Sequence, residues 1–300
     1  MRQHAVSISP FLDGRDRYER VMEGWVDNTH EDAFTHTVQL RDEDHAIELR
    51  AVCTPSPGYE VREAQARILS GPADPALVSA FAALGGERMV GGFTRRLLEV
   101  AGARAGGGLF VDAGIEIARL ARQATKLPVA ATAGLRAGDA RQCWDLDMAG
   151  WVDLPNSCFT YSGAGRALLD TRAVTTPMVR ELYSPPAGAR KIFHRRKLAR
   201  LVRTGPRLDL FHAMHDNVHG FDIHLQIDLD AGRIVAADSV TSRLPYRGIC
   251  DAPQGKIATL VGEPADALLR RRIQGTLGGE GGCAQLYDLT ADLLKLLALP

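Results

Sequence analysis

The chain has 300 residues, of which 45% are hydrophobic, and this size and composition exclude a protein that is disordered throughout. Its 36 Lys and Arg residues balance 36 Asp and Glu residues, which excludes a general attraction to nucleic acid, to anionic membranes or to acidic substrates. We therefore expect no nucleic-acid partner and no membrane partner.

The first ten residues lack the apolar run of a signal peptide, and no apolar stretch of about 18 residues occurs that could span a bilayer. The cysteines are odd in number and widely spread, at Cys53, Cys143, Cys158, Cys250 and Cys283. This usage fits reduced thiols better than a disulfide framework. We expect a cytoplasmic location.

The first predicted element is a β-hairpin. Residues 34–40 alternate between apolar and polar side chains, and residues 46–52 form a second apolar strand after a short turn. A proline-bearing loop at 55–59 follows, and residues 64–68 are predicted to begin helical structure. A glycine cluster then precedes a long helix over about 105–123.

The middle of the chain, residues 126–211, falls outside this pattern and is predicted to be a connecting segment with long loops. Long structured connections tend to be functional, so we expect this one to lie across the groove between two lobes. Near its end, residues 189–203 hold seven Lys and Arg residues together with an apolar stripe. We interpret this run as a solvated helix face, with steering of an anionic substrate as the alternative and nucleic-acid binding last.

The last part of the chain repeats the order of the first. Residues 221–227 alternate in the same phase as the first strand, and residues 233–240 form the partner strand. A loop with Pro245 follows, and a glycine cluster at 278–282 precedes an amphipathic helix that ends near Leu297.

This repetition predicts an α+β protein that is bilobed, with two similar lobes, each a β-hairpin or antiparallel sheet followed by helices. Residues 1–125 form the first, divergent lobe, residues 126–211 the connecting segment over the inter-lobe groove, and residues 212–300 the better-preserved second lobe.

The densest chemical cluster is a group of four histidines within thirteen residues: His212, His215, His219 and His224. Three of them could converge on a metal ion, yet no His-Glu-x-x-His pattern occurs. One or two could instead act as general acid–base groups, since imidazole titrates near neutral pH. A purely structural or exposed role is the third alternative.

Three short motifs are similar to those of the bacterial domain-of-unknown-function family 2889, in its two-copy form. They are Met214-His-Asp-Asn-Val-His-Gly-Phe221, Leu244-Pro-Tyr-Arg-Gly-Ile-Cys250 and Gly282-Cys-Ala-Gln-Leu-Tyr-Asp-Leu289. The sequence departs from the family at Gln285, where the family usually has His, and the first copy matches the motifs poorly. A Cys/His metal site that the family pattern suggests is weakened by this departure.

The resemblance implies an enzyme of aromatic-compound catabolism. Members are associated with bacterial breakdown of aromatic compounds, and a two-copy relative resembles a lyase that removes formaldehyde from a lignin-derived phenylcoumaran dimer. We therefore expect a cofactor-independent carbon-carbon lyase acting on a phenolic aromatic dimer through a quinone methide. The alternatives are a non-catalytic binding protein for a hydrophobic aromatic molecule and a Zn- or Fe-dependent enzyme.

Such a lyase needs a base, donors that hold a phenolate, and an apolar slot. The expected catalytic residues are His219, His224 and Tyr246. The expected substrate-binding residues are Tyr59, Gln39, Gln226, Arg247 and His215. No metal ligand and no cofactor are predicted, and the expected partner is an aromatic small molecule, with a homo-oligomer left open.

Overall fold

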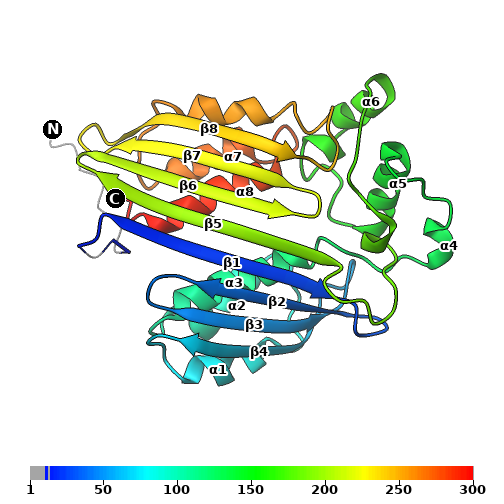
Figure 1. Ribbon diagram of the computed structural model, residues 1–300, viewed down its shortest axis with the longest axis horizontal. Coiled ribbons are helices and arrows are strands. Elements are labelled where there is room, and N and C mark those ends of the chain that lie inside the picture. The colour runs from blue at the N-terminus through cyan, green and yellow to red at the C-terminus, as the bar shows by residue number, and fades with distance from the viewer. Residues whose placement is uncertain (1–10, 13, 300) are drawn as a thin grey trace.

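The computed structural model describes residues 11, 12 and 14–299, and the first ten residues, on which the expectation about a signal peptide rests, lie outside them. An eight-stranded antiparallel sheet forms its centre, in the order β4-β3-β2-β1-β5-β6-β7-β8 (Figure 1). The strands are β1 Arg17–Asp27, β2 Phe34–Arg41, β3 Ala46–Cys53, β4 Val61–Ser70, β5 Phe193–Thr204, β6 Arg207–Asp216, β7 Gly220–Asp228 and β8 Arg233–Arg243.

Helices follow each group of four strands and also fill the middle of the chain. The α-helices are α1 Ala76–Ala80, α2 Phe93–Leu97, α3 Gly107–Leu120, α4 Val129–Thr132, α5 Ala140–Gly150, α6 Gly163–Thr171, α7 Leu269–Leu277 and α8 Ala284–Leu293. Short 3₁₀ helices are η1 Phe81–Leu84, η3 Phe159–Tyr161, η4 Arg180–Leu182, η5 Gln254–Leu260 and η6 Leu294–Leu296, and η2 Leu98–Gly102 is a π-helical turn. No helix among the described residues combines the length and the apolarity that crossing a bilayer requires.

The two halves of the sheet have the same strand order, read outward from the centre. Strands β1 to β4 form one meander and β5 to β8 the other, and β1 pairs with β5 in antiparallel fashion along ten residue pairs from Arg17↔Val202 to Val26↔Phe193. The α+β class is therefore confirmed. The expected separation into two lobes is not seen, because the sheet runs without a break across its middle.

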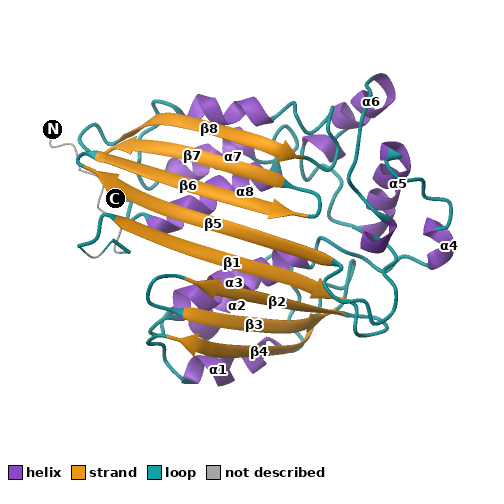
Figure 2. Cartoon of the chain, in the orientation of Figure 1, coloured by secondary structure: helices purple, strands orange, loops and turns teal. Residues whose placement is uncertain are grey.

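Helices cover one face of the sheet and leave the other uncovered (Figure 2). In β7 the side chains of Phe221, Ile223 and Leu225 are buried, whereas the intervening His224 and Gln226 are partly exposed. This alternation is the one predicted from the sequence, and it is typical of an antiparallel sheet with one solvated face. Side chains on the uncovered face therefore lie away from the helices.

Two segments that were expected to be helical are strands. Residues 64–68 lie within β4, where Ala64 and Ala66 are buried between exposed polar neighbours. Most of the basic run lies in β5, a strand and not a helix. Its cations divide between the two faces, because Arg195 and Lys197 are buried on the helix side whereas Arg196 is exposed. The expected domain boundary after residue 211 also falls inside a strand, β6.

A buried ion-pair network joins the two halves beneath the sheet. Lys197 Nζ lies 2.7 Å from Glu116 Oε1 on α3, and Arg119 NH1 donates to Asp292 Oδ2 on α8 at 2.5 Å. Burial opposes ionisation of Asp292, but Arg119 and its neighbouring lysines hold the pKa of this carboxyl well below its usual range. Paired in this way, the charges are compensated inside the core.

Candidate functional site

A cavity of about 140 Å³ lies at the end of the sheet where β6 turns into β7. The segment that carries α5 and α6 packs beside this end (Figure 1) and supplies much of the cavity wall. An apolar cavity of about 150 Å³ accommodates benzene, so this one has room for a single aromatic ring. Its apolar wall includes Trp151, Leu154, Met178, Phe221 and Leu244.

The three motifs that carry the family resemblance meet at this cavity. The first motif supplies His219, the second supplies Cys250, and the third supplies Cys283 and Gln285 at the start of α8. Residues that are spread over the last third of the sequence are thus brought together by the turn after β6, the loop after β8 and the N-terminus of α8. The middle segment lies over this end of the sheet and not over a groove between lobes.

His219 is held by Asp216 in the turn between β6 and β7. Asp216 Oδ1 accepts from the backbone N–H of Val218 at 2.8 Å and of His219 at 2.6 Å, and it lies 3.1 Å from His219 Nδ1. Its other oxygen, Oδ2, accepts from Nε of the fully buried Arg195 at 2.9 Å. Burial alone would raise the pKa of Asp216, but His219 and Arg195 hold it well below its usual range.

This arrangement fixes the imidazole of His219. Because a carboxylate only accepts, Nδ1 carries the proton that faces Asp216, and Nε2 of the neutral ring is left as an acceptor. His219 lines the cavity, and Nε2 has no hydrogen-bond partner among the described residues. A carboxylate that orients an imidazole in this manner is the arrangement used by general-base histidines.

The same turn occurs between β2 and β3, at the opposite end of the sheet (Figure 1). Asp42 Oδ1 accepts from the backbone N–H of His45 at 2.8 Å and lies 3.1 Å from His45 Nδ1. In both turns the N–H of the Asp donates to the carbonyl oxygen of the His at 2.9 Å. Strands β2 and β3 therefore correspond in order to β6 and β7. The repeat predicted from the sequence matched residues 34–40 in β2 with residues 221–227 in β7, and this match is displaced by one strand.

A second polar cluster surrounds Asp147, which projects from α5. Its carboxylate accepts from the hydroxyls of Tyr161 at 2.7 Å and Tyr183 at 2.7 Å, and from that of Tyr246. Burial raises the pKa of Asp147 to about 6, although the three hydroxyls favour the carboxylate. Of the three tyrosines, Tyr161 alone lines the cavity among the described residues. Tyr246, expected to be catalytic, is fully buried behind it.

The polar groups of the cavity-lining residues differ in whether their donors already have hydrogen-bond partners in the protein. Arg122 is engaged throughout, because its guanidinium donates to Asp153 and to the carbonyl oxygens of Ala118 and Met89. The indole Nε1 of Trp151 is buried without a hydrogen-bond partner in the described part of the chain. A buried unpaired donor is costly, and neighbouring atoms cover this one from solvent.

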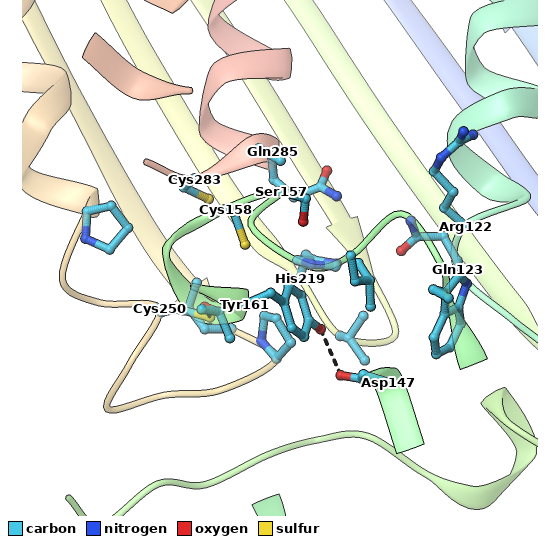
Figure 3. Close-up of a pocket in the computed structure, with 18 of the residues that line it drawn as sticks. Arg122, Gln123, Asp147, Ser157, Cys158, Tyr161, His219, Cys250, Cys283 and Gln285 are labelled. Carbon is cyan, nitrogen blue, oxygen red and sulfur yellow. Dashed lines mark hydrogen bonds between the residues drawn. The ribbon is translucent and has the colours of Figure 1, made fainter. Parts of the chain in front are cut away.

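Three thiols gather on one side of the cavity, where Figure 3 shows Cys158, Cys250 and Cys283, with His219 and Tyr161 beside them. Burial raises the pKa of each thiol, to about 11 for Cys283. Protonated, buried thiols behave as small apolar groups. This wall therefore suits a hydrophobic ligand.

The other predicted histidines lie elsewhere. His224 is on the uncovered face, 3.4 Å from Asp209 and 3.5 Å from Asp238, and His215 pairs with Asp222 at 3.0 Å. They do not converge with His219. Within residues 11, 12 and 14–299, no group of three or more His, Cys, Asp or Glu side chains is placed to hold a metal ion.

The remaining residues expected to bind substrate do not line the cavity. Gln39 Nε2 donates to Glu48 at 2.8 Å, and Gln226 Nε2 donates to Asp209 at 2.8 Å, both between residues of the sheet. Tyr59 is buried and donates to Asp153, and Arg247 donates to backbone carbonyl oxygens at the end of β8. The structure brings His219 alone, of the eight predicted residues, to the cavity wall.

Asp147, Trp151 and Tyr161 were not predicted, because they lie in the segment without a repeated pattern. The turns at Asp42–His45 and Asp216–His219 share an Asp-x-x-His spacing that was also overlooked. The same spacing occurs at Asp27–His30 and Asp209–His212, so by itself it does not single out these turns.

Comparison with known proteins supports the resemblance over part of the chain. Residues 203–298, about a third of the length, match the model of a family described as "Protein of unknown function (DUF2889)". The matched stretch holds β6, β7, β8, α7 and α8, together with all three motifs. No curated protein and no solved structure matches the chain.

Proposed function

We propose that the protein is a cofactor-independent carbon-carbon lyase that releases formaldehyde from a phenolic, lignin-derived aromatic dimer. The observation that carries the proposal is His219, which is oriented by Asp216 and lines a cavity with room for one aromatic ring. The resemblance of the three motifs to aromatic-catabolism proteins supports the same class of substrate. The second ring of a dimer would lie at the mouth of the cavity.

The reaction proceeds without an oxidant or a metal ion. The para-phenolate of one ring pushes electrons toward the benzylic carbon, the benzylic carbon–oxygen bond of the ring ether breaks, and a quinone methide forms. The hydroxymethyl group then loses its O–H proton, its carbon–carbon bond breaks, and the released electron pair forms a carbon–carbon double bond that restores the phenolate. The products are a stilbene and formaldehyde, and together they have the atoms of the substrate.

The chain supplies a group for each requirement. Nε2 of His219 accepts the hydroxymethyl proton as the general base, because Asp216 holds the ring through Nδ1 and leaves Nε2 free to accept. The Nε1–H of Trp151 has no partner and is covered by neighbouring atoms, so a shift of the cavity wall would let it donate to the phenolate oxygen. A donor that faces a charge contributes more than one that faces a neutral group. The apolar wall and the protonated thiols hold the ring.

The test compares two substrates that differ by one methyl group. The wild-type protein is incubated with a phenylcoumaran dimer that has a free para-hydroxyl group, and separately with the para-methoxy ether of the same dimer. We expect one equivalent of formaldehyde and one of stilbene from the phenol and none from the ether, because the ether has no proton to lose and cannot form the phenolate or the neutral quinone methide. Binding of the phenol without formaldehyde release would replace the lyase by the alternative, a binding protein for aromatic molecules.

A further inference from the structure

The proposed reaction needs a second proton transfer that His219 does not supply. When the benzylic carbon–oxygen bond breaks, a phenoxide leaves, and a proton must reach its oxygen. That oxygen and the hydroxymethyl oxygen are bonded to different carbons, and His219 serves the hydroxymethyl oxygen as a base. An acid at another point of the cavity wall is therefore required.

Tyr161 and Asp147 form a pair of proton-bearing groups in the cavity wall with the geometry of a relay. Tyr161 and Asp147 both line the cavity, and the Tyr161 hydroxyl is 2.7 Å from Asp147 Oδ2 (Figure 3). We propose that Tyr161 is the general acid that protonates the leaving phenoxide, and that Asp147 is the positioning residue that resupplies its proton. This inference rests on the proposed lyase function.

The three-tyrosine arrangement fits this role. When Asp147 carries a proton, its O–H can donate to Tyr161, whose own O–H then turns to the cavity. Tyr183 and Tyr246 remain donors to the two carboxylate oxygens and stabilise the negative charge once the proton has left. The elevated pKa of Asp147, which burial raises to about 6, keeps a fraction of the carboxyl protonated near neutral pH.

The proton balance closes over one turnover. The Tyr161 proton passes to the leaving phenoxide oxygen as the carbon–oxygen bond breaks, and the Asp147 proton passes to Tyr161. The hydroxymethyl proton passes to His219 Nε2. Solvent then returns one proton to Asp147 and takes one from His219, so no proton and no electron is gained or lost.

The chain provides matched controls for the test. Tyr161→Phe, Tyr183→Phe and Tyr246→Phe each remove one hydroxyl from the same carboxylate, yet only the first of these hydroxyls belongs to a residue that lines the cavity. We expect Tyr161→Phe to lower kcat for formaldehyde release on the order of 10²- to 10⁴-fold. Tyr183→Phe and Tyr246→Phe each remove a donor to Asp147 but keep the Tyr161 hydroxyl, so each should lower kcat by a smaller factor than Tyr161→Phe does.

A second substrate separates acid catalysis from a structural role. A dimer whose leaving phenol carries a nitro group departs as a stable phenoxide and needs no acid. The loss caused by Tyr161→Phe should therefore largely disappear with this dimer. A loss of equal size with both dimers, or equal losses for all three tyrosine variants, would overturn the inference. Formaldehyde release by the wild type that needs His219 but not Tyr161 would overturn it while leaving the lyase function in place.

Discussion

The two Asp-x-x-His turns of the sheet have the same hydrogen bonds but different surroundings. The side chain of His219 is 11% exposed and lines the ring-sized cavity, whereas that of His45 is 25% exposed and lines an open groove of about 610 Å³. The middle segment with α5 and α6 packs at the end of the sheet that holds the Asp216–His219 turn. A fixed imidazole is thus present twice, and the cover over it distinguishes the candidate site.

The carboxylates of the two turns also have different partners. Asp216 is paired with the fully buried Arg195, whereas Asp42 accepts from the hydroxyl of Tyr18 at 2.9 Å. In a buried site, a guanidinium favours the ionised form of a carboxylate more strongly than a neutral hydroxyl does. The Asp216–His219 turn, which the middle segment covers, is therefore also the turn whose carboxylate is paired with a cation.

The largest effect on stability is expected from removing that cation. Arg195→Met leaves the Asp216 carboxylate buried without a cationic partner, which should lower the free energy of unfolding by about 3–5 kcal/mol. Tyr18→Phe removes a single neutral donor from Asp42 and should cost about 1 kcal/mol. Urea unfolding of both variants measures the difference, and equal losses would show that the two turns are stabilised in the same way.

A smaller, pH-dependent effect should also separate the turns. Folding lowers the pKa of both carboxylates, and it lowers that of Asp216 further than that of Asp42. Each carboxylate therefore stabilises the fold above its unfolded pKa, about 3.9, and this contribution is lost as the pH falls toward the folded pKa. The stability deficit of Asp216→Asn should therefore be greatest at pH 7 and shrink in acid, with a weaker trend for Asp42→Asn. A deficit of Asp216→Asn that is the same at pH 7 and pH 3 would contradict this account.

The sequence predicted those strands whose alternation is uninterrupted. Strands β2, β3, β7 and β8 and the helices α3 and α8 were predicted, because their core-facing positions are mostly apolar. Strands β1, β5 and β6 were missed. Strand β5 turns Arg195 and Lys197 toward the core, β6 turns His212 there, and β1 places Gly24 there. A Cβ at Gly24 would lie 2.8 Å from Leu120 Cδ1, so close approach of α3 accounts for a residue that breaks the pattern.

The only part of the candidate site that could be predicted is the part whose residues lie close together in one short sequence motif. His219 was identified because it lies in a dense histidine cluster and in a family motif. Asp147 and Tyr161 are brought to the cavity by the packing of a segment that has no periodic sequence pattern. Tyr246, which was expected to be catalytic, donates to the same Asp147 carboxylate but does not line the cavity. Which tyrosine reaches the cavity depends on that packing, and the sequence has no pattern that encodes it.

The most direct measurement compares His219→Ala with His45→Ala in formaldehyde release from a phenolic phenylcoumaran dimer. Both variants remove an imidazole from the same type of turn, and their thermal unfolding shows whether each is folded. The account predicts that kcat/KM falls on the order of 10²- to 10⁴-fold in His219→Ala and is unchanged in His45→Ala. Equal activity of the two variants would contradict the central claim that the enclosed, Asp216-held histidine is the base.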